Sequence, residues 1–188
     1  MSDGVQSEKF EVVTLSGQPK KRDQEGLTLI ELLIVIAVGI LILAGVATFI
    51  QRAFSGSNLA KETQNINLIM TEMRSIRSAA GYGAPNTDLV PMMINLELAP
   101  PSLLNGNALV NSWNGSVNVK STGTSFVIEY EKVPQKDCSK LVTNFSQAGT
   151  FVSIGVGGTT KVGPISASES ETLCADKNEN KLTFTSKR

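Results

Sequence analysis

The pattern of hydrophobic residues changes at residue 51. Residues 27–50 are apolar on every side of a helix, and Glu31 is the only charged residue among them. A helix of this length is about 36 Å long at about 1.5 Å per residue, which is enough to cross a hydrocarbon core of about 30 Å. The run therefore predicts a transmembrane helix that carries one carboxylate near its beginning.

The pattern becomes one-sided in residues 51–80, which contain no proline. Apolar residues recur there at spacings of seven, three, four, three and four, which is typical of one face of a helix. They are Leu59, Ile66, Ile69, Met73, Ile76 and Ala80. The opposite, polar face is expected to hold Lys61, Glu62, Gln64, Glu72, Arg74 and Arg77. The two segments predict one long helix that ends at the glycines and proline of residues 81–86.

Shorter elements are expected after this helix. Residues 81–114 read as a loop with a short helix over 91–98, whose apolar residues Met92, Met93, Ile94, Leu96 and Leu98 fit either a core or a subunit contact. Strands are predicted over residues 126–131, 151–156 and 181–186, and a helix beginning at Pro134 places Cys138 on its buried face. Ser168 and Glu171 have capping-box spacing before a helical turn that ends near Cys174. The pattern predicts an α+β domain.

Composition limits the functions that are open to the chain. Its 188 residues allow one domain beyond the apolar run, and its 17 basic and 17 acidic residues leave no excess charge for nucleic acid. Histidine is absent, which removes the commonest general base and metal ligand. We therefore expect no catalytic residue, no metal and no cofactor. Cys138 and Cys174 lie beyond the apolar run, on the side of the membrane opposite the basic residues Lys20-Lys21-Arg22, where an even pair predicts a disulfide rather than two free thiols.

Glu31 needs a counter-charge, because a carboxylate inside a membrane costs about 2.5–3.5 kcal/mol. Cleavage between Gly26 and Leu27 would free an ammonium group at a similar depth. Within one helix the two groups point poorly at each other, whereas staggered copies could pair them. The alternative is a signal anchor with a cytoplasmic tail and a stray glutamate. A conventional secretory signal fits less well, because the only suitable cleavage site precedes the apolar run.

The cluster Lys20-Lys21-Arg22, followed by Gly26, Leu27 and Glu31, resembles a type IV prepilin. This resemblance implies cleavage after Gly26 by a membrane peptidase, methylation of the new terminus at Leu27, and a role for Glu31 in assembly. The basic cluster also orients the preceding tail to the cytoplasm.

Further motifs resemble the type IVb branch of that family. They are Ala44-Gly45-Val46, Gln51-Arg52-Ala53-Phe54, Ser57-Asn58, the turn at residues 111–115, and the sequences around Cys138 and Cys174. The branch implies a pilin fold, in which a long N-terminal helix packs on an antiparallel sheet and a disulfide bounds the C-terminal region. The expected divisions are a leader at 1–26, a transmembrane and assembly half at 27–50, an amphipathic half at 51–80, and a head at 81–188. The head would comprise a loop at 81–114 and the sheet and disulfide region at 115–188.

The same resemblance implies that the chain is a structural subunit of a pilus used for adhesion, aggregation or conjugation. Its implied partners are other copies of the chain, the prepilin peptidase and methyltransferase, the inner-membrane assembly machinery, and a receptor on a host or recipient cell. It would lie in the bacterial inner membrane before assembly and in an extracellular pilus afterwards. A minor pilin, a type II secretion pseudopilin and a single-pass tethered binding domain are the alternatives.

Overall fold

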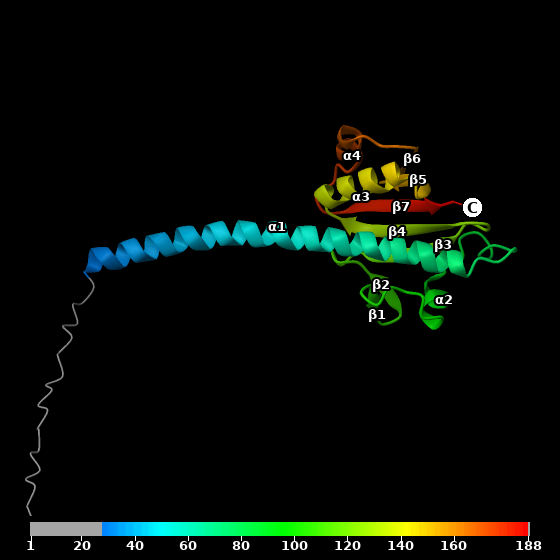
Figure 1. The fold of residues 1–188 in the computed structure, drawn as a ribbon, viewed down its shortest axis with the longest axis horizontal. Helices are drawn as coiled ribbons and strands as arrows, with labels where there is room; N and C mark the ends of the chain where they lie inside the picture. The colour runs from blue at the N-terminus through cyan, green and yellow to red at the C-terminus, as the bar shows by residue number, and fades with distance from the viewer. Residues whose placement is uncertain (1–27, 188) are drawn as a thin grey trace, which may run out of the picture. The chain divides into compact units, whose positions relative to one another are not determined.

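The structure is a computed structural model (Figure 1). It describes residues 28–187, except for the side chains of residues 44–55. The chain divides into two compact units, Met1–Gly45 and Val46–Arg188. Each unit is therefore described by itself. Helix α1, Leu29–Ser75, contributes to both units.

The first part of α1 exposes apolar side chains on all sides. Leu29 is 78% exposed and Leu43 is 70% exposed, and the large apolar residues between them are at least about half exposed. Glu31 is the only charged residue in the described stretch 28–43. Across the described part of the chain, no helix is both long enough and apolar enough to count as a membrane span.

The second part of α1 packs against the head through the predicted stripe. Ile66, Ile69 and Met73 are fully buried, and Leu59 and Ile76 pack against the same core while remaining partly exposed. The predicted polar face is wrong at one position, because Glu62 is fully buried. Glu62 lies three residues after Leu59 and four before Ile66, so it occupies the stripe itself.

Helix α1 ends at Ser75, before the predicted end at Ala80. The Ser75 hydroxyl donates to the carbonyl oxygen of Glu72 at 2.7 Å. The chain then turns to bring Tyr82 to the sheet, where its N–H donates to the carbonyl oxygen of Gly123 at 2.8 Å and its ring meets Phe126 edge-on. Helix α1 therefore ends earlier than predicted because the chain docks on the sheet. Local helix propensity carries no information about this long-range contact.

The head contains an antiparallel sheet of seven strands within residues 104–186, in the order β1-β2-β3-β4-β7-β5-β6. The last strand of the sequence lies between β4 and β5 in the middle of the sheet, as Figure 1 shows. The strands are β1 Leu104–Asn105, β2 Ala108–Val110, β3 Ser116–Ser121, β4 Phe126–Val133, β5 Phe151–Val156, β6 Thr159–Val162 and β7 Asn180–Ser186. The strand predictions for β4, β5 and β7 are confirmed, whereas β1, β2, β3 and β6 lie outside the predicted strand ranges.

The strand register builds one apolar face. Val119 pairs with Ile128, Ile128 with Phe184, and Phe184 with Ile154, so four strands contribute one continuous buried row. The alternate residues form a polar outer face, where Glu129 lies 3.1 Å from Lys120 and 3.5 Å from Lys181. This alternation is the period-two pattern that predicted β4.

Two further helices complete the head. Helix α3, Gln135–Ala148, begins after Pro134 and buries Cys138, Leu141, Val142 and Phe145, as predicted. Helix α4, Ala167–Leu173, is capped by Ser166, whose hydroxyl accepts the N–H of Glu169 at 3.2 Å. The predicted capping box at Ser168 and Glu171 is therefore displaced by two residues, because Ser166 and Glu169 have the same spacing and precede it.

The short helix between α1 and β3 packs on the core. Helix α2, Val90–Asn95, is shorter than the predicted helix over 91–98. Met93 is fully buried and Met92, Ile94 and Leu98 pack partly against the core, whereas Leu96 is 55% exposed. Core packing therefore accounts for this apolar segment apart from Leu96.

Candidate functional site

Glu31 lies in the first turn of α1, where its main-chain N–H is 3.4 Å from the Thr28 hydroxyl. Its carboxylate is exposed and has no salt bridge within the described residues. The other predicted processing residues lie outside the described part of the chain. They are Lys20, Lys21, Arg22, Gly26 and Leu27.

A buried polar cluster joins α1 to the turn before β3. One carboxylate oxygen of Glu62 accepts the N–H of Ser112 at 2.8 Å and the Ser112 hydroxyl at 2.5 Å. The other oxygen accepts from the Asn65 side chain at 3.1 Å, and Asn65 accepts in turn from the Ser102 hydroxyl at 2.7 Å. These bonds compensate for desolvation of the carboxylate. They tie the helix to segments 37 and 50 residues away in sequence.

The turn held by Glu62 is also fixed from within. The side-chain oxygen of Asn111 accepts the N–H groups of Trp113 at 3.0 Å and Gly115 at 2.9 Å, and its NH₂ group donates to the carbonyl oxygen of Glu131 at 2.8 Å. A Cβ at position 115 would overlap that same carbonyl oxygen, so the turn requires glycine. Trp113 is partly buried and packs against the core.

Tyr130 faces Glu62 from β4. The tyrosine side chain is fully buried, and its hydroxyl has no hydrogen-bond partner of acceptable geometry in the described structure. Burial raises the pKa of Tyr130 well above its ordinary value, and the nearby Glu62 carboxylate raises it further. The hydroxyl therefore stays protonated in the folded state over a wider pH range than in the unfolded state.

We expect the stability of the protein to fall as the pH rises above the ordinary tyrosine pKa of about 10. The unfolded chain then loses the Tyr130 proton while the folded chain keeps it, so the loss continues until the raised folded pKa is reached. Tyr130→Phe should remove this alkaline dependence and raise stability by up to about 1 kcal/mol, because it deletes a buried hydroxyl without a partner. Urea unfolding at several pH values measures both effects. Tyr82→Phe is the control: Tyr82 is only partly buried, so this substitution should reduce the alkaline loss of stability less. An unchanged dependence of stability on alkaline pH in Tyr130→Phe would contradict the prediction.

The predicted disulfide is present. Cys138 of α3 and Cys174 at the end of α4 are bonded, with their Cα atoms 6.0 Å apart, and both are fully buried. Hydroxyl groups join the same two helices: Thr143 donates to the Ser170 hydroxyl at 3.0 Å and Ser139 to the Ser170 carbonyl at 3.4 Å. The disulfide and these two hydrogen bonds therefore join the same pair of helices.

Removing the disulfide should destabilise the head strongly. The bond spans 36 residues, so the loop-entropy model gives a loss of about 3–4 kcal/mol for the double variant Cys138→Ala with Cys174→Ala. Urea unfolding of the variant and the wild type under non-reducing conditions measures the difference. A loss below about 1 kcal/mol would show that the unfolded chain is already compact in this region.

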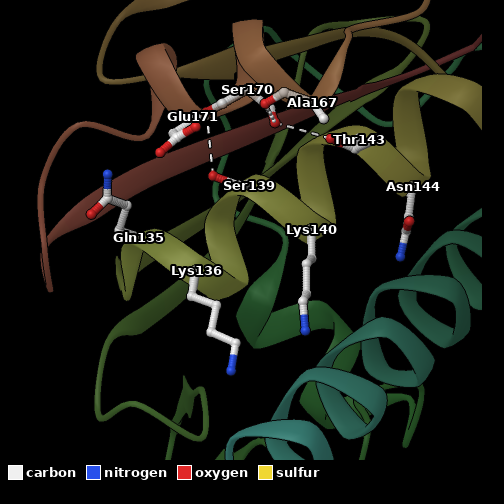
Figure 2. A pocket seen from close by; sticks show the side chains of 9 residues that line it. All are labelled: Gln135, Lys136, Ser139, Lys140, Thr143, Asn144, Ala167, Ser170 and Glu171. Carbon is white, nitrogen blue, oxygen red and sulfur yellow. Dashed lines mark hydrogen bonds between the residues drawn. The ribbon is translucent and has the colours of Figure 1, made fainter.

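A hollow of about 530 Å³ lies between α3 and α4 (Figure 2). Ser139, Thr143 and Ser170 meet along its floor, whereas Lys136 and Lys140 point away from α4 on the outer side of α3. The lining is completed by Gln135, Asn144, Ala167 and Glu171. Among residues 28–187, no group of three or more carboxylate, imidazole or thiol side chains is placed to hold a metal ion.

Comparison with known proteins shows which family shares this architecture. The family model described as PilS N terminal matches residues 56–187, and the prokaryotic N-terminal methylation motif matches residues 21–47. The chain belongs to the PilS family of pilins. It is 25% identical over 165 residues to a toxin coregulated pilin of Vibrio cholerae, covering 84% of this chain and 74% of that protein. A second toxin coregulated pilin, from Vibrio cholerae serotype O1, is 28% identical over 147 residues, covering 73% of this chain and 65% of that protein.

Solved pilin structures share the fold. A type IVb pilin from Salmonella typhi superimposes with a TM-score of 0.56 at 22% identity, over 69% of this chain and 97% of that chain. TcpA, a type IV pilin from the El Tor biotype of Vibrio cholerae, gives a TM-score of 0.54 at 16% identity, over 70% of this chain and 99% of that chain. These comparisons confirm the predicted helix-and-sheet pilin fold. Type IV pilins are membrane-anchored precursors that form extracellular pili, so this pilin is a structural subunit rather than an enzyme.

Proposed function

We propose that this pilin is made as a single-pass protein of the bacterial inner membrane, with residues 27–50 spanning the bilayer and the leader 1–26 in the cytoplasm. Prepilin peptidase then cleaves after Gly26, and Leu27 is methylated at its new amino group. The basic residues Lys20, Lys21 and Arg22 keep the leader on the cytoplasmic side before cleavage. The inner-membrane assembly machinery finally transfers the mature subunit into the filament.

The observation that carries this proposal is the exposed apolar surface of α1. In a single chain, residues from Leu29 to Leu43 present large apolar side chains on every side, with Glu31 as the only charge in the described stretch. Such a surface is typical of a segment covered by lipid or by other protein chains. Transfer from lipid to a bundle of identical helices keeps it out of water throughout assembly.

Glu31 acts during this transfer. In the bundle, its carboxylate pairs with the amino group of Leu27 in a neighbouring copy. The pair fixes the axial position of one subunit relative to the next more securely than it adds net stability, because desolvation offsets much of the attraction. Assembly then depends on removal of the leader, which creates the amino group.

The filament serves adhesion, aggregation or conjugation, through contact with a receptor on a host or recipient cell. A minor pilin or a type II secretion pseudopilin would have the same anchor, so the amount of this chain in sheared filaments separates these roles. A major subunit should be the dominant protein in the sheared fraction.

Intact-mass analysis of the chain from sheared filaments tests the processing step. The mature protein should begin at Leu27 and carry one methyl group. Gly26→Val should leave the chain unprocessed, because a branched side chain replaces the residue at the scissile bond. Gly17→Ala in the same leader is the matched control and should be processed normally. A mature chain that still begins at Met1, or a normally processed Gly26→Val variant, would refute the proposed cleavage site.

A further inference from the structure

The chain contains two Asn-Gly pairs, Asn105-Gly106 and Asn114-Gly115. In such a pair, the main-chain nitrogen of glycine can attack the side-chain amide carbon of asparagine, since no Cβ shields it. A nitrogen–carbon bond forms, the bond to the side-chain nitrogen breaks, and ammonia leaves. Water then opens the cyclic imide to give aspartate or isoaspartate. The reaction needs only water, and it needs a glycine nitrogen that is free to move.

The structure holds the second pair in place. The Gly115 nitrogen donates to the Asn111 side chain at 2.9 Å, and the Asn114 nitrogen donates to the Asn111 carbonyl oxygen at 3.0 Å. The main chain of Gly115 also lies close to the carbonyl oxygen of Glu131, which a Cβ at this position would overlap. The Gly115 nitrogen, which would be the nucleophile of this pair, is therefore held by its hydrogen bond to Asn111.

The first pair has none of these restraints. Asn105 ends β1, an edge strand of two residues that pairs only with β2, and its partner is Ala108. Gly106 and Asn107 form the loop between these strands, and residues 104–108 are all exposed. Nothing lies within 4 Å of where a Cβ of Gly106 would be. In a two-residue hairpin, the N–H of the first loop residue lies outside the strand ladder.

We propose that Asn105 is a site of spontaneous deamidation in the folded protein and that Asn114 is protected from it. Either product adds a negative charge to residues 78–119, a segment that contains Asp88 and Glu97 but no lysine or arginine. The new carboxylate at position 105 therefore has no cation in this segment. The isoaspartate form also lengthens the main chain by one methylene group and disrupts the Asn105–Ala108 pairing. Modified subunits carry an altered edge of the sheet.

The test compares the two asparagines within one molecule. The purified full-length mature chain is incubated in mildly alkaline buffer, and peptide mapping by mass spectrometry follows each site. Asn105 should convert to a mixture of aspartate and isoaspartate while Asn114 stays intact. In denaturant the two sites should react at similar rates, because the hydrogen bond from Gly115 to Asn111 is lost. Gly106→Ala should slow conversion at Asn105 in both states.

Three results would overturn the proposal. One is an intact Asn105 in the folded chain under conditions in which the denatured chain reacts. Another is equal reaction of the two sites in the folded chain. The third is a preference for Asn105 that persists unchanged in denaturant, since local sequence would then explain it without the fold.

Discussion

Glu31→Ala should leave leader removal intact and reduce filament formation sharply. The substitution leaves the scissile bond unchanged and makes the segment easier to insert, because it removes a charge from the apolar run. In the proposed bundle, however, the amino group of Leu27 would lose its counter-charge. An uncompensated buried charge costs about 3–5 kcal/mol, so affinity between subunits should fall on the order of a hundredfold or more. The yield of sheared filaments, normalised to processed subunit in the membrane, measures the effect.

Comparison of Glu31→Ala with Glu31→Gln separates the effect of the charge from that of side-chain size. Glu31→Gln keeps the shape of the side chain but removes its charge, so it should assemble as poorly as Glu31→Ala. Glu72→Ala in the same helix is the matched control, because Glu72 is outside the apolar run and its carboxylate has no salt bridge in the described structure. Normal filament yield from Glu31→Ala would remove the assigned role of this residue and favour a tethered single domain.

The elements that could be predicted from sequence are those whose pattern follows their own burial. β4 alternates because its two faces meet different surroundings, and α3 repeats Cys138, Leu141, Val142 and Phe145 because one side of it packs on the sheet. β1 and β6 have only two and four residues, which are too few for a period to emerge. The position of β7 between β4 and β5 depends on long-range pairing that no local pattern encodes.

The residues of the candidate site also divide into those that a local sequence pattern predicts and those that it does not. The paired cysteines were predicted directly from the sequence, and the disulfide is present. The pattern of Gly26, Leu27 and Glu31 is also local, and its role in processing and assembly stays a prediction. Glu62 was assigned to the polar face because its side chain is charged, although its spacing from Leu59 and Ile66 completes the buried stripe. Its partner Ser112 lies 50 residues away. These two residues meet only in the folded chain. The one indication of their contact in the sequence was a charged residue at a position of the apolar stripe.

Glu62 should therefore contribute strongly to the stability of the head. Glu62→Ala removes the acceptor of the Ser112 N–H and hydroxyl and of the Asn65 side chain, and it leaves a cavity beside Tyr130. Buried donors without an acceptor cost about 1–3 kcal/mol each, so we expect a total loss of about 3 kcal/mol or more. Glu62→Gln should lose less, because its remaining carbonyl oxygen can still accept from Ser112. Glu72→Ala should change stability by less than about 0.5 kcal/mol.

Trp113 allows the local effect to be separated from global unfolding, because it is the only tryptophan and it follows Ser112 directly. In Glu62→Ala, tryptophan fluorescence should change at a lower urea concentration than the far-UV circular dichroism, since the turn at residues 111–115 is released from α1 before the sheet unfolds. In the wild type the two transitions should coincide. If Glu62→Ala kept coincident transitions and wild-type stability, the buried carboxylate would not be what attaches the helix to the turn. The apolar contacts of Ile66, Ile69 and Met73 would then have to hold the two together.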